Sequence, residues 1–89
     1  MPDRLMARAS HVELRLCERD PASESAMAPD PEHDRLAYIQ EGALIVAIAD
    51  DPPVELHAGD SYVIPAGARC AFEVLEPATL VEAIGPAQR

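Results

Sequence analysis

Short apolar or alternating segments recur along the chain, and turn-forming residues separate them roughly every eight to twelve residues. Such segments, rich in valine, isoleucine and leucine, are typical of strands, whereas an amphipathic helix needs a longer run with apolar residues three and four apart. We therefore expect an all-β fold, either a sandwich or a barrel, without helices. The expected strands cover residues 11–17, 36–40, 43–49, 54–56, 61–64, 70–75 and 79–84.

Proline and glycine mark the breaks between these segments. Residues 20–31 contain three prolines and two serines, which predicts a long loop, since proline removes a backbone donor and fixes φ. A turn at Glu41-Gly42 is expected to end one strand before the next begins. In residues 11–17 the apolar side chains alternate with polar ones, which predicts a half-buried strand with its apolar face inward.

The length and the charge of the chain limit its organisation and its partners. Its 89 residues are expected to form one domain, residues 1–89, with a core from about 11 to 84. Because so small a domain buries only about 60% of its unfolded surface, we expect a homodimer, with Tyr38 and Tyr62 either in its interface or in internal packing. The net charge of -9, from 16 acidic residues and seven basic ones that are all arginine, argues against nucleic acid and against an acidic membrane as partners.

Cysteine usage and the short apolar runs indicate a cytoplasmic protein. Cys17 and Cys70 are too few and too widely separated for a disulfide framework, so both are expected to be reduced thiols. Residues 1–9 lack the apolar stretch of a signal peptide. The longest apolar run, residues 43–49, is far too short to span a membrane.

Residues 59–72 contain glycine, proline and glycine at a recognisable spacing. Gly59, Pro65 and Gly67 stand where the second sequence motif of the cupin family has these three residues, so the segment resembles that motif. Residues 38–42, which read Tyr-Ile-Gln-Glu-Gly, resemble the turn that ends the first cupin motif. The resemblance covers roughly residues 12–84 and implies a cupin-type double-stranded β-helix, that is, a jelly-roll barrel.

The same resemblance implies that the usual metal ligands of cupins are replaced in this chain. The glutamate position falls on Arg35, and Cys70 stands in place of the histidine of the second motif. The two histidines of the first motif fall on Pro29 and Pro31, or on Ala28 and Asp30 with a longer spacer. Because proline offers no donor and arginine is a cation, only Cys70 remains as a ligand, and we expect no metal cofactor.

A rearranged metal site is the alternative. Asp30, His33, Asp34 and Cys70 would then converge on a divalent transition metal, which requires residues 20–31 to fold over the mouth of the barrel. In that case the resemblance implies a metal-dependent enzyme of the dioxygenase, isomerase or decarboxylase class, among which the fold does not choose. Otherwise His33 and Asp34 form an exposed turn before a strand.

Arg35 has a defined place in the expected barrel. Strand alternation puts residues 35, 37 and 39 on one face, which the resemblance directs toward the interior. An inward arginine needs a partner, because an unpaired buried charge is costly. The partner is a protein carboxylate such as Glu73 or Asp34, or solvent at the open end, or a bound carboxylate or phosphate.

The expected function follows from this interior. We expect a small molecule, with an anionic group held by Arg35, to bind against Ile39, Cys70 and Phe72, or the chain to serve as an interaction module. No catalytic residue is expected, since no histidine is placed to activate Cys70 as a nucleophile. Cys70 is instead expected to be a small buried residue, unless the charge of Arg35 lies close enough to activate it.

Overall fold

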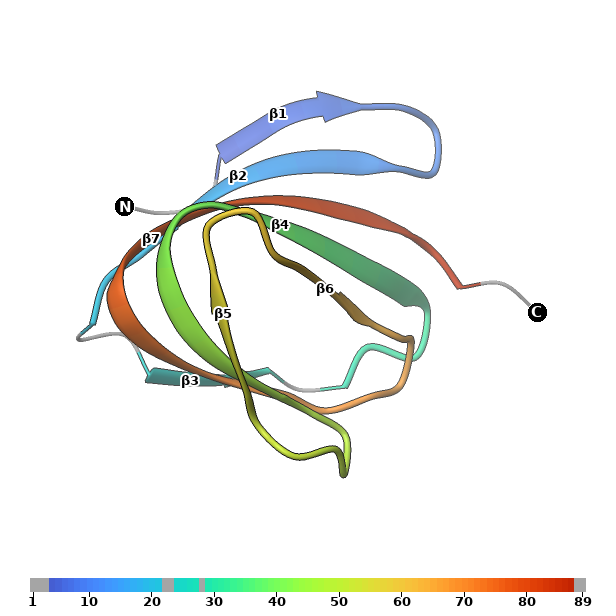
Figure 1. The fold of residues 1–89 in the computed structure, drawn as a ribbon. Helices are drawn as coiled ribbons and strands as arrows, with labels where there is room; N and C mark the ends of the chain where they lie inside the picture. The colour runs from blue at the N-terminus through green and yellow to red at the C-terminus, as the bar shows by residue number, and fades with distance from the viewer. Residues whose placement is uncertain (1–3, 22–23, 28, 88–89) are drawn as a thin grey trace.

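The computed structural model describes residues 4–21, 24–27 and 29–87, and every regular element within these ranges is a strand (Figure 1). All pairings between the strands are antiparallel. In the same ranges, no helix is present that would be long and apolar enough to cross a membrane. The strands are β1 (Arg4–Arg8), β2 (Glu13–Arg19), β3 (Glu24–Met27), β4 (His33–Ile48), β5 (Val54–His57), β6 (Ser61–Ile64) and β7 (Cys70–Pro86).

Two long strands organise the fold. β4 and β7 pair along nearly their whole length, from His33 opposite Pro86 to Ile48 opposite Cys70. Both strands bend near the middle of this ladder, where the register shifts (Figure 1). The two halves of each strand therefore lie in different layers.

Short strands extend these halves, so that the one seven-stranded sheet of the described residues folds over into two facing layers, called the first and the second sheet below (Figure 1). The first sheet has the order β1, β2, C-terminal half of β7, N-terminal half of β4, β6. The second has the order β3, N-terminal half of β7, C-terminal half of β4, β5. This double-sheet arrangement confirms the predicted all-β jelly-roll class.

The hydrophobic core lies between the two sheets and follows strand alternation. On β4, Ala37 and Ile39 are buried whereas Leu36 and Tyr38 are exposed, as expected for side chains on opposite faces of a strand. The buried side chains of both sheets pack into one cluster. Its members are Cys17, Ala37, Ile39, Leu44, Val46, Tyr62, Ile64, Cys70, Val74, Ala78 and Leu80.

The predicted turn at Glu41-Gly42 is wrong, because the expected strands on either side of it form the single strand β4. Gly42 has a φ of +93°, a conformation open to glycine, and the ladder with β7 is irregular on both sides of it. Glycine thus allows β4 to bend sharply and still remain paired.

Two further differences from the prediction concern prolines. The expected strands 70–75 and 79–84 form the single strand β7, because the ladder with β4 steps from Glu76 to Thr79 past Pro77, which has no N–H to donate. Residues 20–31, predicted as a loop, contain the edge strand β3, which pairs with β7. The prolines of that segment lie outside β3, so they do not interrupt its pairing.

The N-terminal part of the chain also departs from the prediction. β1, which the sequence did not suggest, pairs with β2. On β2 the expected inward face is wrong: Cys17 is fully buried, so Glu13 and Arg15 share the inner face, while Val12 is half exposed. The inner face of the first sheet accommodates these two charges because Arg15 and Glu13 form an ion pair with each other, at 2.7 Å.

Candidate functional site

Four charged or polar side chains gather on the inner face of the first sheet, around the small residue Ala37. In the ladders Arg15 lies opposite Glu82, Glu82 opposite Ala37, and Ala37 opposite Tyr62. Residues directly opposite each other in an antiparallel sheet project from the same face, so these residues form one inward row. Arg35 lies two residues before Ala37 on β4 and therefore on the same face.

Arg35 and Glu82 form the central ion pair of this group. Arg35 Nη1 donates to Glu82 Oε1 at 3.2 Å, and the Glu82 side chain is only 7% exposed against 26% for Arg35. The structure thus pairs Arg35 with a protein carboxylate, one of the alternatives weighed from the sequence. Glu73 and Asp34, which the sequence suggested as partners of Arg35, were wrong. Glu73 is exposed, and Asp34 accepts a hydrogen bond from the Ala66 N–H at 2.8 Å.

Two buried polar atoms of this group, Arg35 Nε and the Tyr62 hydroxyl, have no hydrogen-bond partner in the described part of the chain. Tyr62 is 8% exposed, and its ring contacts that of Phe72, on the opposite sheet, with centroids 6.0 Å apart. Burial, followed by the charge of Glu82, raises the pKa of Tyr62, so the hydroxyl keeps its proton. An unpaired buried polar group costs about 1–3 kcal/mol, so a ligand atom gains most by binding at these two positions.

Cys70 is a buried thiol on the second sheet. It is 2% exposed and free of any disulfide, as expected for a small buried residue. Burial, with a smaller contribution from Glu82, raises the pKa of Cys70 to about 11. Arg69 does not lower it, because its side chain points outward and pairs with Asp50. The thiol is therefore protonated near neutral pH.

We expect iodoacetamide to label Cys70 slowly at about pH 8, and the rate to keep rising toward pH 11, because the thiolate is the reactive form. The pKa in the folded chain lies above the ordinary value of 9.0, so the stability from this group is retained below pH 9 and lost as the pH rises toward 11. Mass spectrometry of labelled peptides separates Cys70 from Cys17. Rapid labelling of folded protein near pH 7 would contradict the assignment.

The four predicted ligand residues all lie in the interior, but on both sheets. Arg35 and Ile39 belong to β4 in the first sheet, and Cys70 and Phe72 to β7 in the second. Ile39 is fully buried, whereas Phe72 is partly buried and packs against the core. The core thus brings the four into one interior, with the aromatic contact to Tyr62 joining the two sheets.

Sequence reasoning missed Glu82 and left the role of Tyr62 open. A lone acidic residue in the apolar segment 79–84, in phase with Leu80 and Ile84, was the signal for an inward carboxylate. For Tyr62 there was no such signal in the sequence, since its neighbour Val63 is apolar although it is exposed in the structure. The signal for Glu82 does not by itself identify its partner across the sheet.

An apolar pocket of about 190 Å³ adjoins this interior between β4, β5 and β6. Val46 and Ile48 line it, and they lie opposite Phe72 and Cys70 in the ladder. Tyr62 lines it as well, so the pocket reaches the side chain that carries the unpaired hydroxyl. The other lining residues are Asp51, Pro52, Val54, Leu56 and Ser61.

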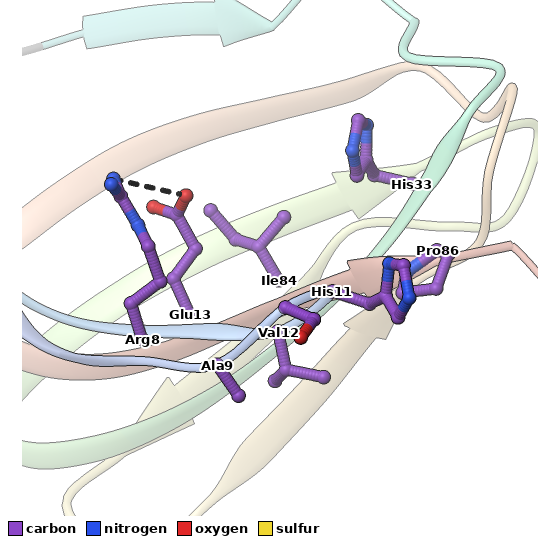
Figure 2. A pocket seen from close by; sticks show the side chains of 9 residues that line it. Arg8, Ala9, His11, Val12, Glu13, His33, Ile84 and Pro86 are labelled. Carbon is purple, nitrogen blue, oxygen red and sulfur yellow. Dashed lines mark ion pairs between the residues drawn. The ribbon is translucent and has the colours of Figure 1, made fainter.

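A polar pocket of about 290 Å³ lies where β1 and β7 end and β2 and β4 begin (Figure 2). Arg8 and Glu13 form an ion pair in it at 3.5 Å, and Glu13 also accepts a hydrogen bond from Arg15 Nε at 2.7 Å, which lowers the pKa of Glu13. Ile84 lies between this pocket and the Arg35–Glu82 ion pair. In the ladders it is opposite Glu13 on one side and opposite Arg35 on the other. The other lining residues are Ala9, Ser10, His11, Val12, His33 and Pro86.

The residues at the ligand positions of the cupin motifs do not fit a metal. Arg35 is a cation already paired with a carboxylate, and Cys70 retains its proton. Of the rearranged set, Asp30 and His33 lie together, with His33 Nδ1 3.0 Å from Asp30 Oδ2. Within the described ranges, no three histidine, cysteine, aspartate or glutamate side chains group as a metal site requires. Ala28 lies outside these ranges.

The fold is that of a cupin, because two facing antiparallel sheets are joined by a bent pair of long strands. Gly67 of the second motif has a positive φ, as a tight turn there requires. The model of the EutQ-like cupin domain matches residues 22–79, well over half of the chain. The chain therefore belongs to the EutQ-like cupin family. A comparison with curated proteins gave no significant match.

Solved structures share this fold at low sequence identity. BH2720 from Bacillus halodurans has a TM-score of 0.85 and 18% identity, covering 98% of this chain and 71% of its own. KdgF from Halomonas sp. has a TM-score of 0.82 and 22% identity, covering 98% of this chain and 78% of its own. EutQ from Clostridium difficile has a TM-score of 0.79 and 19% identity, and this chain, matched over 97%, spans only 62% of it. At these identities the similarity establishes the fold alone.

Proposed function

We propose that this chain is a cupin that binds a small molecule in its interior, without a metal and without catalysing a reaction. The observation that carries the proposal is the pair of buried donors without partners, Arg35 Nε and the Tyr62 hydroxyl. Both suit a ligand oxygen that accepts hydrogen bonds. The loss of imidazole and carboxylate from the motif positions supports binding without a metal. Cys17 and Cys70, which form no disulfide, support a cytoplasmic location.

The ion pair narrows the chemistry of the proposed ligand. Arg35 already shares its charge with Glu82. Burial, followed by the charge of Glu82, raises the pKa of both Tyr62 and Cys70. A further negative charge beside these groups is therefore unfavourable, and an uncharged acceptor, a hydroxyl or a carbonyl oxygen, fits better than the anion expected from the sequence. The remainder of the ligand is apolar, to match Phe72 and the adjoining pocket.

Replacing Tyr62 by phenylalanine separates ligand binding from folding. We expect the free energy of unfolding to stay constant or to rise by about 1 kcal/mol, because the variant removes a buried hydroxyl without a partner. Ligand binding is expected to weaken by at least about tenfold, since the neutral hydrogen bond from the Tyr62 hydroxyl to the ligand is lost. Thermal shift against a panel of sugars, polyols and ketones, followed by calorimetry of the hits, measures both effects.

The matched control for this experiment is Tyr38→Phe, because Tyr38 is 48% exposed on the outer face. It is expected to change neither stability nor binding. If Tyr62→Phe lowers the free energy of unfolding by more than about 1 kcal/mol, the hydroxyl is paired in the folded chain and the proposal fails. Compounds that bind Tyr62→Phe and the unaltered chain equally well would also count against it.

Metal analysis tests the alternative of a metal-dependent enzyme. The proposal expects elemental mass spectrometry to find far less than one transition-metal ion per purified chain. A stoichiometric metal that disappears in Cys70→Ser or His33→Ala would support the enzyme instead, because those residues belong to the rearranged ligand set.

A further inference from the structure

The polar pocket of about 290 Å³ (Figure 2) lies apart from the motif positions of the cupin family. Most of its wall comes from residues 8–13, that is, from the end of β1, the hairpin turn and the start of β2. The family model matches residues 22–79, so this wall lies outside the matched region. A hydrogen bond from the Ala9 N–H to the Val12 carbonyl oxygen, at 2.8 Å, closes the turn and places Ser10 and His11 at the pocket.

Glu13 and Arg8 offer an anionic acceptor and a cationic donor side by side in this pocket. Arg15 Nε and Nη2 both lie 2.7 Å from Glu13 Oε2, so Oε1 of the same carboxylate keeps the capacity to accept from a ligand. Arg8 Nη2 lies 3.5 Å from Glu13 Oε1 (Figure 2), and the Arg8 side chain is 60% exposed. Most of the N–H donors of the Arg8 guanidinium are therefore available to a ligand.

His33 adds a second acceptor, and its ring is held in place. Its Nδ1 lies 3.2 and 3.0 Å from the two carboxylate oxygens of Asp30. Asp30 is itself anchored, because its side chain accepts from the Glu32 N–H at 3.0 Å and its carbonyl oxygen accepts from the Gly67 N–H at 2.9 Å. A carboxylate beside Nδ1 favours a proton on that nitrogen, which leaves the lone pair of the neutral ring on Nε2. His33 lines the pocket whereas Asp30 does not, so the ring presents its other edge there.

The charged side chains that line this pocket, or that pair with a lining residue, balance one another in the described part of the chain. Arg8 and Arg15 are the cations, and Glu13 and Asp30 are the anions. The pKa of Glu13 is lowered chiefly by its hydrogen bond with Arg15, and that of Asp30 chiefly by the Glu32 N–H, so both carboxylates are ionised near neutral pH. A ligand of either net charge meets a like charge here, whereas a ligand with one charge of each sign pairs with both.

We propose that this pocket is a second binding site and that it takes a small zwitterion, namely an α-amino acid with an apolar side chain. The ammonium group donates to Glu13 Oε1 and His33 Nε2, and the carboxylate accepts from the Arg8 guanidinium. Ser10 adds a hydroxyl donor beside the carboxylate, and the apolar side chain lies against Ile84. Because the charged groups of the pocket are partly exposed, the expected dissociation constant is on the order of 1 mM. The site does not depend on the interior one.

Nuclear magnetic resonance of the isotope-labelled full chain, titrated with L-valine to about 20 mM, measures this binding. Amide shifts are expected at residues 8–13 and at His33 and Ile84. Isobutylamine lacks the carboxylate of valine, and isovalerate lacks its ammonium group. Each is expected to bind at least about tenfold more weakly, because one of the charge-assisted contacts is lost. Xylitol, an uncharged polyol, is expected to cause no shifts.

Arg8→Met is expected to weaken the binding of L-valine by at least about fivefold and to leave the fold intact, because the Arg8 side chain is exposed. The matched control is Arg69→Met: Arg69 is 74% exposed and pairs with Asp50 away from the pocket. It is expected to leave binding unchanged. Tyr62→Phe, which tests the interior site, is also expected to leave L-valine binding unchanged, so the two proposals fail separately.

The proposal is overturned if L-valine causes no shifts at about 20 mM, or if the shifts lie around Tyr62 and Phe72 instead. Binding of isovalerate, isobutylamine or xylitol as tight as that of L-valine also overturns it, because the charges of the pocket would then play no part. Unaltered binding in Arg8→Met has the same meaning. If Arg8→Met fails to fold by circular dichroism, the comparison of the three analogues on the unaltered chain still decides.

Discussion

Gly42→Ala is expected to destabilise the chain by about 4 kcal/mol, the largest effect among the four glycines of the chain. The φ of +93° at the bend of β4 is unfavourable for any residue with a Cβ. The new Cβ would also overlap the carbonyl oxygen of Pro77 and lie 2.6 Å from Ala78 Cα. These are backbone atoms of β7, so no side-chain rotation relieves the overlap. Urea unfolding followed by circular dichroism measures the loss.

Gly67→Ala is the control that separates backbone strain from overlap. Gly67 also has a positive φ, of +83°, but a Cβ built there meets no atom within 4 Å. Its replacement is expected to cost only about 1 kcal/mol. Equal losses in the Gly42 and Gly67 variants would contradict the tight approach of β4 to β7 at the bend.

Arg35→Met is expected to lower the free energy of unfolding by about 3 kcal/mol, because it removes the donor that lies 3.2 Å from a carboxylate only 7% exposed. Methionine retains most of the volume and the apolar stem, so the loss reports on the charge of Glu82 rather than on packing. Thermal and urea unfolding at neutral pH measure it.

Two comparisons test this interpretation of the Arg35 variant. Arg69→Met removes a pair in which Arg69 is 74% exposed and Asp50 96% exposed, and its expected effect is below about 0.5 kcal/mol. The double variant Arg35→Met, Glu82→Leu is expected to recover most of the lost stability, because an apolar pair replaces a buried ion pair. A double variant less stable than Arg35→Met would show that Glu82 stabilises the chain through its other contacts.

The fold class was predictable because it depends on local patterns. Alternating apolar residues and regular turn residues define short strands, and the spacing of Gly59, Pro65 and Gly67 carries the cupin resemblance. Whether a strand continues through a bend is not a local property. Gly42 and Pro77 each look like the end of a strand in the sequence, and only the partner strand shows that the pairing goes on around them.

The candidate site was predictable in part. Alternation on β4 was enough to place Arg35 and Ile39 on the inner face. The partner of Arg35 was not predictable, because Glu82 comes from a distant segment whose register no local pattern determines. The inner face of β2 was misassigned for a related reason. Its inward charges, Glu13 and Arg15, are tolerated because they pair with each other, and the leucines of β2 face outward.

The sharing of β4 and β7 between both sheets has a consequence for how the chain folds. β2 and β3 hydrogen-bond to β7, whereas β5 and β6 hydrogen-bond to β4, so neither sheet is complete until the two long strands pair with each other. Bringing the long strands together means closing a loop across much of the chain, which is slow. Once that closure occurs, the central pair of strands of both sheets is complete. Because the two sheets share this pair, we expect them to form and to unfold together in one cooperative transition.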